Sequence, residues 1–171
     1  MRTVMFKGSP VALAGELPSV GSKAPDFILT NASLEDVSWE TLRGPVTILS
    51  VVPSLDTGVC AASARRLNRE LASYAEIQLL KVSMDLPFAQ KRFCDTERLD
   101  RVVTLSAFRS PDFGSRYGVR IENGPLKGLL ARAVFVVDER GLLQHVQLVP
   151  EITQEPDYDA VLKTLRTLIK G

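Results

Sequence analysis

An apolar run over residues 46–52, interrupted only by Thr47 and Ser50, constrains the fold of this chain more than any other feature. Such a run is typical of a strand that is buried on both faces of a parallel sheet, because a half-exposed strand alternates apolar and polar residues. The run leads into the loop Pro53-Ser54-Leu55-Asp56-Thr57-Gly58, and a helical spacing of apolar residues begins at Val59. The segment therefore predicts a strand, a loop and a helix, with Cys60 in the first helical turn.

The rest of the chain supplies the elements of one α/β domain. The patterns predict an N-terminal hairpin (3–6 and 11–14), short strands over 27–29 and 37–39, a helix over 59–74, a strand over 77–83, a helix over 87–94, a strand over 102–105, a helical turn over 111–117, a hairpin (131–137 and 142–149) and a final helix over 156–169. This order is that of a thioredoxin-like α/β fold, with a central mixed sheet and helices on both faces. We expect a single domain over residues 1–171, with residues 1–20 as an appended hairpin.

Composition narrows the possible partners. The 171 residues are 45% hydrophobic, which is enough for one compact core, and the formal net charge is +1. Without a basic excess we expect neither nucleic acid nor an anionic membrane as a partner. No apolar run is long enough to span a bilayer and no signal-peptide core is present, so we expect a cytoplasmic protein. Asp85, Asp95 and Glu97 are interpreted as surface charges.

Cys60 has two possible roles. A thiol in the first turn of a helix lies among backbone N–H groups that lack partners and at the positive end of the helix dipole, and both effects favour the reactive thiolate. Cys60 also shares an apolar stripe with Ala64 and Leu67, so it could be a small core residue. Asp56 and Thr57 are natural caps that would place Cys60 near the third or fourth helical position, which favours the reactive role.

Cys94 is the only other cysteine. It could pack inward from a short amphipathic segment, or it could condense with an oxidised Cys60, and the sequence does not show whether the two sulfurs meet. The single histidine, His145, excludes a multi-histidine metal site and is interpreted as an ordinary strand residue. We expect neither a metal nor an organic cofactor.

The segment from Pro53 to Cys60 resembles the peroxidatic motif of the peroxiredoxins, Pro-x-x-x-Thr/Ser-x-x-Cys. Further segments narrow the resemblance to the bacterial thiol peroxidases, which are atypical two-cysteine peroxiredoxins, and extend it over nearly the whole chain. These segments are Gly21-Ser22-Lys23-Ala24-Pro25-Asp26-Phe27, Arg92-Phe93-Cys94, Leu105-Ser106-Ala107-Phe108-Arg109, Tyr117-Gly118-Val119, Gly128-Leu129-Leu130-Ala131-Arg132-Ala133 and Pro150-Glu151-Ile152-Thr153-Gln154-Glu155-Pro156-Asp157-Tyr158.

The resemblance implies roles for five residues. Cys60 would be the peroxidatic nucleophile and Cys94 the resolving thiol, while Pro53 would shield the nucleophile. Thr57 would hydrogen-bond the thiolate or the peroxide, and Arg132 would stabilise the thiolate and polarise the substrate. The neighbours of Arg132 independently predict a buried strand, and a buried arginine needs an anionic partner.

The activity that the resemblance implies is thiol-dependent reduction of hydrogen peroxide and organic hydroperoxides to water or alcohols. A Cys60 sulfenic acid and a Cys60–Cys94 disulfide would be the intermediates, thioredoxin the electron donor, and a homodimer the working unit in antioxidant defence. One departure is visible: Gly58 stands where many members of the family have proline, which should loosen the loop.

Two other classes of function stay open on the sequence alone. A redox sensor would use the same two thiols as a disulfide switch, and only turnover with a reductant separates it from an enzyme. A noncatalytic thioredoxin-like interaction domain would carry inert, buried thiols. A thioredoxin-type oxidoreductase is disfavoured because the chain has no Cys-x-x-Cys.

Overall fold

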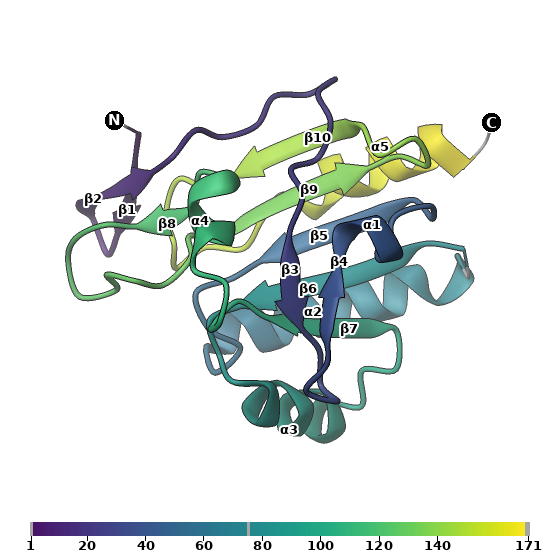
Figure 1. Ribbon diagram of the computed structural model, residues 1–171, viewed down its shortest axis with the longest axis horizontal. Coiled ribbons are helices and arrows are strands. Elements are labelled where there is room, and N and C mark those ends of the chain that lie inside the picture. Colours follow the sequence, from purple (N-terminus) through teal and green to yellow (C-terminus); the bar gives the residue numbers. More distant parts are fainter. Residues whose placement is uncertain (1, 75, 170–171) are drawn as a thin grey trace.

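The computed structural model describes residues 2–74 and 76–169, except for the side chain of Cys60, and is built on a seven-stranded mixed sheet (Figure 1). The strand order is β10-β9-β5-β6-β7-β3-β4. The strands are β3 (Ile28–Thr30), β4 (Asp36–Ser38), β5 (Thr47–Val51), β6 (Gln78–Ser83), β7 (Val102–Ser106), β9 (Ala133–Val137) and β10 (Leu143–Leu148). The pairs β5/β6 and β6/β7 are parallel, while β9 and β10 extend the sheet as an antiparallel pair, as predicted.

Helices lie on both faces of this sheet. They are α1 (Trp39–Leu42), α2 (Gly58–Glu70) with a following 3-10 turn η1 (Leu71–Ser73), α3 (Pro87–Glu97), α4 (Asp112–Arg116) and α5 (Tyr158–Ile169). In Figure 1, α1 and α4 lie in front of the sheet, and α2 lies behind it. None of the described helices is long and apolar enough to cross a membrane.

The face covered by α2 and α5 is packed through the predicted stripes. Ala64, Leu67 and Leu71 of the α2 segment are buried, and they cluster with Leu79 of β6 and Val136 of β9. Because apolar residues three and four positions apart share one side of a helix, this stripe fixes which side of α2 faces the sheet. The orientation of α2 in turn decides where its first turn, with Cys60, is placed.

The opposite face holds a cluster of aromatic rings. Phe113 and Tyr117 stack with ring centroids 4.6 Å apart. The ring centroid of Phe27 lies 5.7 Å from that of Phe113 and 5.7 Å from that of Trp39. Trp39 begins α1 and does not end a strand as predicted, because the Ser38 side chain accepts a hydrogen bond from Thr41 N and caps the helix there.

The N-terminal hairpin forms a second, smaller sheet. Strands β1 (Thr3–Phe6) and β2 (Ser9–Ala14) pair with β8 (Arg120–Ile121) in the order β1-β2-β8. The predicted turn over residues 7–10 is shorter in the structure, because Lys7 and Gly8 both adopt positive φ and close the hairpin in two residues. Strand β8 has only two residues and leaves no periodic signal in the sequence.

Candidate active site

The loop between β5 and α2 is held by the carboxylate of Asp85, which follows β6. Asp85 accepts hydrogen bonds from Ser54 Oγ at 2.8 Å, Leu55 N at 2.8 Å and Ser83 Oγ at 2.7 Å. Asp85 is half-buried in this position. The interpretation of Asp85 as a surface charge is therefore wrong: its carboxylate joins the loop before Cys60 to the end of β6.

The same network reaches β7 and α3. Ser106 Oγ donates to the backbone carbonyl of Asp85 at 2.6 Å. The buried Gln90 of α3 donates through Nε2 to Ser83 Oγ and to Leu105 O, both at 3.0 Å. A signal for this cluster exists in the sequence, because the carboxyl ends of parallel strands meet at one edge of a sheet. Asp85 follows one such strand end, and the Ser54 loop follows the neighbouring one.

The backbone places the predicted nucleophile in the first turn of α2. The helix begins at Gly58, so Cys60 is its third residue, within the predicted range. The side chain of Cys60 lies outside the described part of the structure. Thr57 directly precedes the helix, donates through Oγ1 to Ser54 O at 3.3 Å and accepts from Ala61 N at 3.2 Å through its carbonyl. Pro53 is buried at the start of the loop.

Gly58 is accommodated without backbone strain. It is the first residue of α2, where a side chain at Cβ would meet no heavy atom within 4 Å, and its φ is not in the left-handed region. Proline is favoured at the first position of a helix because its fixed φ suits the helix and its missing N–H has no intrahelical partner there. The position therefore does not require glycine.

Arg132 is buried, as its neighbours predict. Its exposed fraction is 2%, and its Nε donates to Ile152 O at 2.8 Å. It lies one residue before β9, which begins at Ala133 and so is two residues shorter than predicted. Its carbonyl accepts from Val149 N at 3.0 Å, which continues the pairing of this segment with the chain after β10.

Cys94 lies in the last turn of α3 with a free, half-buried thiol. Burial raises the pKa of this thiol, and a hydrogen bond with Thr104 opposes that effect. The helix ends at Arg98, which adopts a left-handed conformation with φ 55°. The backbone N–H groups of Arg98 and of Leu99, the latter at 3.0 Å, donate to the carbonyl of Cys94.

The two cysteine-bearing helices border one open hollow of about 290 Å³. The lining residues come from the loop before α2, from the first turn of α2, and from α3: Leu55, Asp56, Thr57, Gly58, Ala61, Ala89, Arg92, Phe93, Thr96 and Glu97. Among the described residues, no group of three or more His, Cys, Asp and Glu side chains is placed to hold a metal ion. The arrangement offers thiol chemistry beside a hollow that is open to a small molecule.

Comparison with known proteins identifies the family. The redoxin family matches residues 19–162. The thiol peroxidase of Corynebacterium glutamicum is 48% identical over 165 residues, covering 96% of this chain and 99% of the relative. The chain belongs to the redoxin family. The thiol peroxidase of Vibrio cholerae is 45% identical over 163 residues, which cover 95% of this chain and 99% of the relative.

A solved structure agrees with this assignment. The crystal structure of a peroxiredoxin-like protein from Aquifex aeolicus matches with a TM-score of 0.92 and 43% identity, over 98% of each chain. The resemblance to the thiol peroxidases and the thioredoxin-like fold are thereby confirmed. Thiol-dependent peroxidase activity is the function that this membership supports. The roles of the individual site residues remain predictions.

The Asp85 network yields a direct test. We expect Asp85→Asn to lower the free energy of unfolding by about 1–3 kcal/mol, because the amide NH₂ group cannot accept from one of the three donors and leaves it unpaired. We also expect slower oxidation by peroxide, since the loop before Cys60 loses an anchor. Urea unfolding and stopped-flow oxidation measure the two effects.

Asp112→Asn, which changes a carboxylate that is 60% exposed, is the matched control. Equal stability in the two variants would show that the network does not hold the loop.

Proposed function

We propose that the chain reduces hydroperoxides through the thiolate of Cys60. The observation that carries this proposal is the start of α2 at Gly58, which places Cys60 among the N–H groups of the first turn. The sulfur attacks one peroxide oxygen, the O–O bond breaks, and Cys60 becomes a sulfenic acid. The departing oxygen leaves as water or an alcohol after it takes up a proton.

The residues that we assign to the site suit this step. Attack on an O–O bond needs little covalent help, but it needs alignment of the peroxide and stabilisation of charge on the departing oxygen. The Thr57 hydroxyl, once rotated away from Ser54 O, and the buried guanidinium of Arg132 are the donors that we assign to this task, and we assign to Pro53 the exclusion of water from one side. Arginine suits the role better than lysine because its planar fork can contact sulfur and oxygen together.

We assign the resolving step to Cys94, which would attack the Cys60 sulfenic acid and form an intramolecular disulfide. This assignment is supported by the position of α3, which borders the same hollow as the start of α2. Opening the last turn of α3 would break the two backbone hydrogen bonds to the Cys94 carbonyl, but it would release Arg98 from a left-handed conformation that costs about 1–2 kcal/mol. Unwinding there would release Cys94 toward the first turn of α2.

Hydrogen exchange tests this opening. We expect backbone amides of residues 90–98 to exchange faster in the Cys60–Cys94 disulfide form than in the reduced form, because the disulfide holds Cys94 away from its helical position. Residues 47–51 of β5, which are fully buried, serve as the internal reference. Exchange in α3 that is no faster in the disulfide form would contradict local unfolding.

Substitution of each cysteine separates the two roles. We expect Cys60→Ser to abolish peroxide reduction, and Cys94→Ser to reduce one equivalent and then stop as a sulfenic acid. Peroxide consumption with thioredoxin, its reductase and NADPH measures turnover, and omission of thioredoxin is the control for the electron donor that we propose. Equal loss of the first turnover in both variants would overturn the assigned roles.

Recycling by thioredoxin fits the cytoplasmic location that we propose, since that compartment is reducing.

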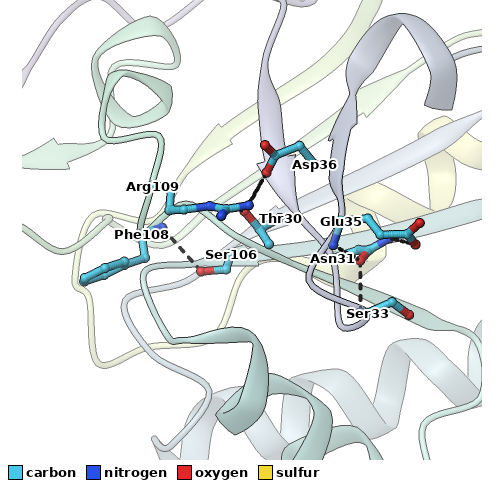
Figure 2. Close-up of polar contacts among 8 residues, drawn as sticks. All are labelled: Thr30, Asn31, Ser33, Glu35, Asp36, Ser106, Phe108 and Arg109. Atoms are coloured by element: carbon cyan, nitrogen blue, oxygen red, sulfur yellow. Dashed lines mark hydrogen bonds and ion pairs between the residues drawn. The ribbon is translucent and has the colours of Figure 1, made fainter.

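We also propose that the chain acts as a homodimer. Leu34, Leu86 and Phe108 are exposed apolar side chains that line one surface hollow of about 220 Å³. Figure 2 shows the ring of Phe108 pointing away from the β3–β4 hairpin, while the neighbouring Arg109 reaches across to Asp36. Clustered apolar side chains on a soluble protein are typical of an interaction surface.

Charge introduced on this surface tests the homodimer. We expect Phe108→Glu to weaken self-association by at least about tenfold, because a carboxylate would have to be buried in the interface. Sedimentation velocity over a concentration series measures the association. Val20→Glu is the control, since Val20 and Phe108 are both 59% exposed. A Phe108→Glu protein that remains as dimeric as the control would exclude this surface.

A further inference from the structure

Lys81 is a buried lysine in the middle of β6. Its exposed fraction is 2%, and its Nζ donates to Ser50 Oγ on β5 at 3.0 Å, with both groups buried. The strand register places Ser50 of β5 and Thr104 of β7 directly on either side of Lys81. A buried ammonium costs free energy unless nearby groups stabilise its charge, so lysine at such a position calls for a reason.

The side chain of Lys81 lies on the face of the sheet that carries the cysteine-bearing helices. Leu79, two residues earlier on β6, packs in the cluster that contains Leu67 of α2 and Cys94 of α3. Residues two apart on a strand share a face, so Lys81 projects to the same side. Thr104, the neighbour of Lys81 on β7, hydrogen-bonds the thiol of Cys94.

The two helix ends affect their cysteines in opposite ways. Cys60 is the third residue of α2, at the positive end of its dipole, whereas Cys94 lies in the last turn of α3, near the negative end. A thiolate is therefore favoured at the start of α2 and disfavoured at the end of α3. The resolving step, however, needs Cys94 as a thiolate, because the thiolate is the attacking form.

Among the described residues, Lys81 is a cation that offsets this disadvantage. In order of size, burial raises the pKa of Cys94, the Thr104 hydrogen bond lowers it, Asp95 on the same helix raises it, and Lys81 lowers it. Strand β7, which packs against α3, carries no charged residue. Arg65 of α2 faces α3 but is paired with Glu97 at 3.0 Å.

We propose that Lys81 is a positioning residue for the resolving step, whose buried ammonium stabilises Cys94 as the thiolate that attacks the Cys60 sulfenic acid. In that step the Cys94 sulfur supplies the electron pair of the new S–S bond, and the S–O bond of the sulfenic acid breaks. The hydroxide leaves and takes up a proton, equivalent to the one that the Cys94 thiol lost, to become water. The inference rests on the proposed function, which makes Cys94 the resolving thiol.

The first test does not depend on catalysis. In a Cys60→Ser chain, Cys94 is the only thiol, and its alkylation by iodoacetamide is followed by mass spectrometry from about pH 6 to about pH 11, because burial raises the pKa of this thiol and the scan must reach the alkaline plateau. We call the pH at which the alkylation rate reaches half its maximum the half-rise. We expect Lys81→Met to move the half-rise to higher pH and to slow alkylation at about pH 7 by roughly 5- to 10-fold. The rate at the alkaline plateau reports access to the thiol, so a merely structural effect would change the plateau and leave the half-rise in place.

Three variants make this test specific. Lys81→Arg keeps the charge and should restore the half-rise, whereas Lys81→Gln removes the charge but keeps a group that can hydrogen-bond Ser50, and serves if Lys81→Met does not fold. Lys163→Met, an exposed lysine of α5, should leave the profile unchanged because water screens its charge. An unchanged half-rise in both Lys81→Met and Lys81→Gln would overturn the inference.

The second test follows the resolving step in the chain with both cysteines. After one equivalent of hydrogen peroxide, the Cys60–Cys94 disulfide is quantified over time by acid quench and peptide mapping. We expect Lys81→Met to slow disulfide formation roughly 5- to 10-fold at about pH 7, with the deficit shrinking as the pH rises. If Lys81→Met shifts the alkylation profile but leaves the rate of disulfide formation unchanged, the role of Lys81 in the resolving step is overturned. No disulfide in the chain with Lys81 intact would instead show that Cys94 is not the resolving thiol, so failure of the proposed function is distinguishable.

Discussion

The carboxylate of Asp85 is the point on which the geometry of the site depends. It accepts from the Ser54 hydroxyl and the Leu55 amide of the loop before α2 and from Ser83 at the end of β6, and the carbonyl of the same residue accepts from Ser106 of β7. Three chain segments that are far apart in sequence are thereby fixed at one edge of the sheet. Because the loop is only six residues long, fixing two of them leaves the start of α2 little freedom.

A second constraint is the polarity of the helices that carry the two thiols. The carboxyl ends of β5 and β6 meet at one edge, and the helix that follows each strand begins there, so the first turn of α2 is suited to an anion. Cys94 lies at the opposite end of its own helix and receives no such help. Instead, Lys81 on β6 and the Thr104 hydroxyl on β7 favour its thiolate, so the stabilisation comes from the sheet and not from the helix.

Much of this architecture is readable in the sequence, because its signals are local. The apolar run of β5, the stripe of α2 and the buried setting of Arg132 follow from periodicity and from neighbouring residues. Long-range pairing leaves no such signal. The two-residue strand β8, the hydrogen bonds of Asp85 and the burial of Lys81 arise only when segments distant in sequence meet. Two sequence features could have drawn attention to these contacts: the charged Lys81 inside an apolar strand, and Asp85 just after the end of that strand.

The central claim is that Cys60 attacks the peroxide and that Cys94 then attacks Cys60. The most direct measurement is peptide-mapped mass spectrometry of the reduced protein after one equivalent of hydroperoxide, with and without dimedone as a trap for sulfenic acid. The account predicts a Cys60–Cys94 disulfide without the trap and a dimedone adduct on Cys60 with it. Two unmodified thiols, or an adduct on Cys94 alone, would contradict the account.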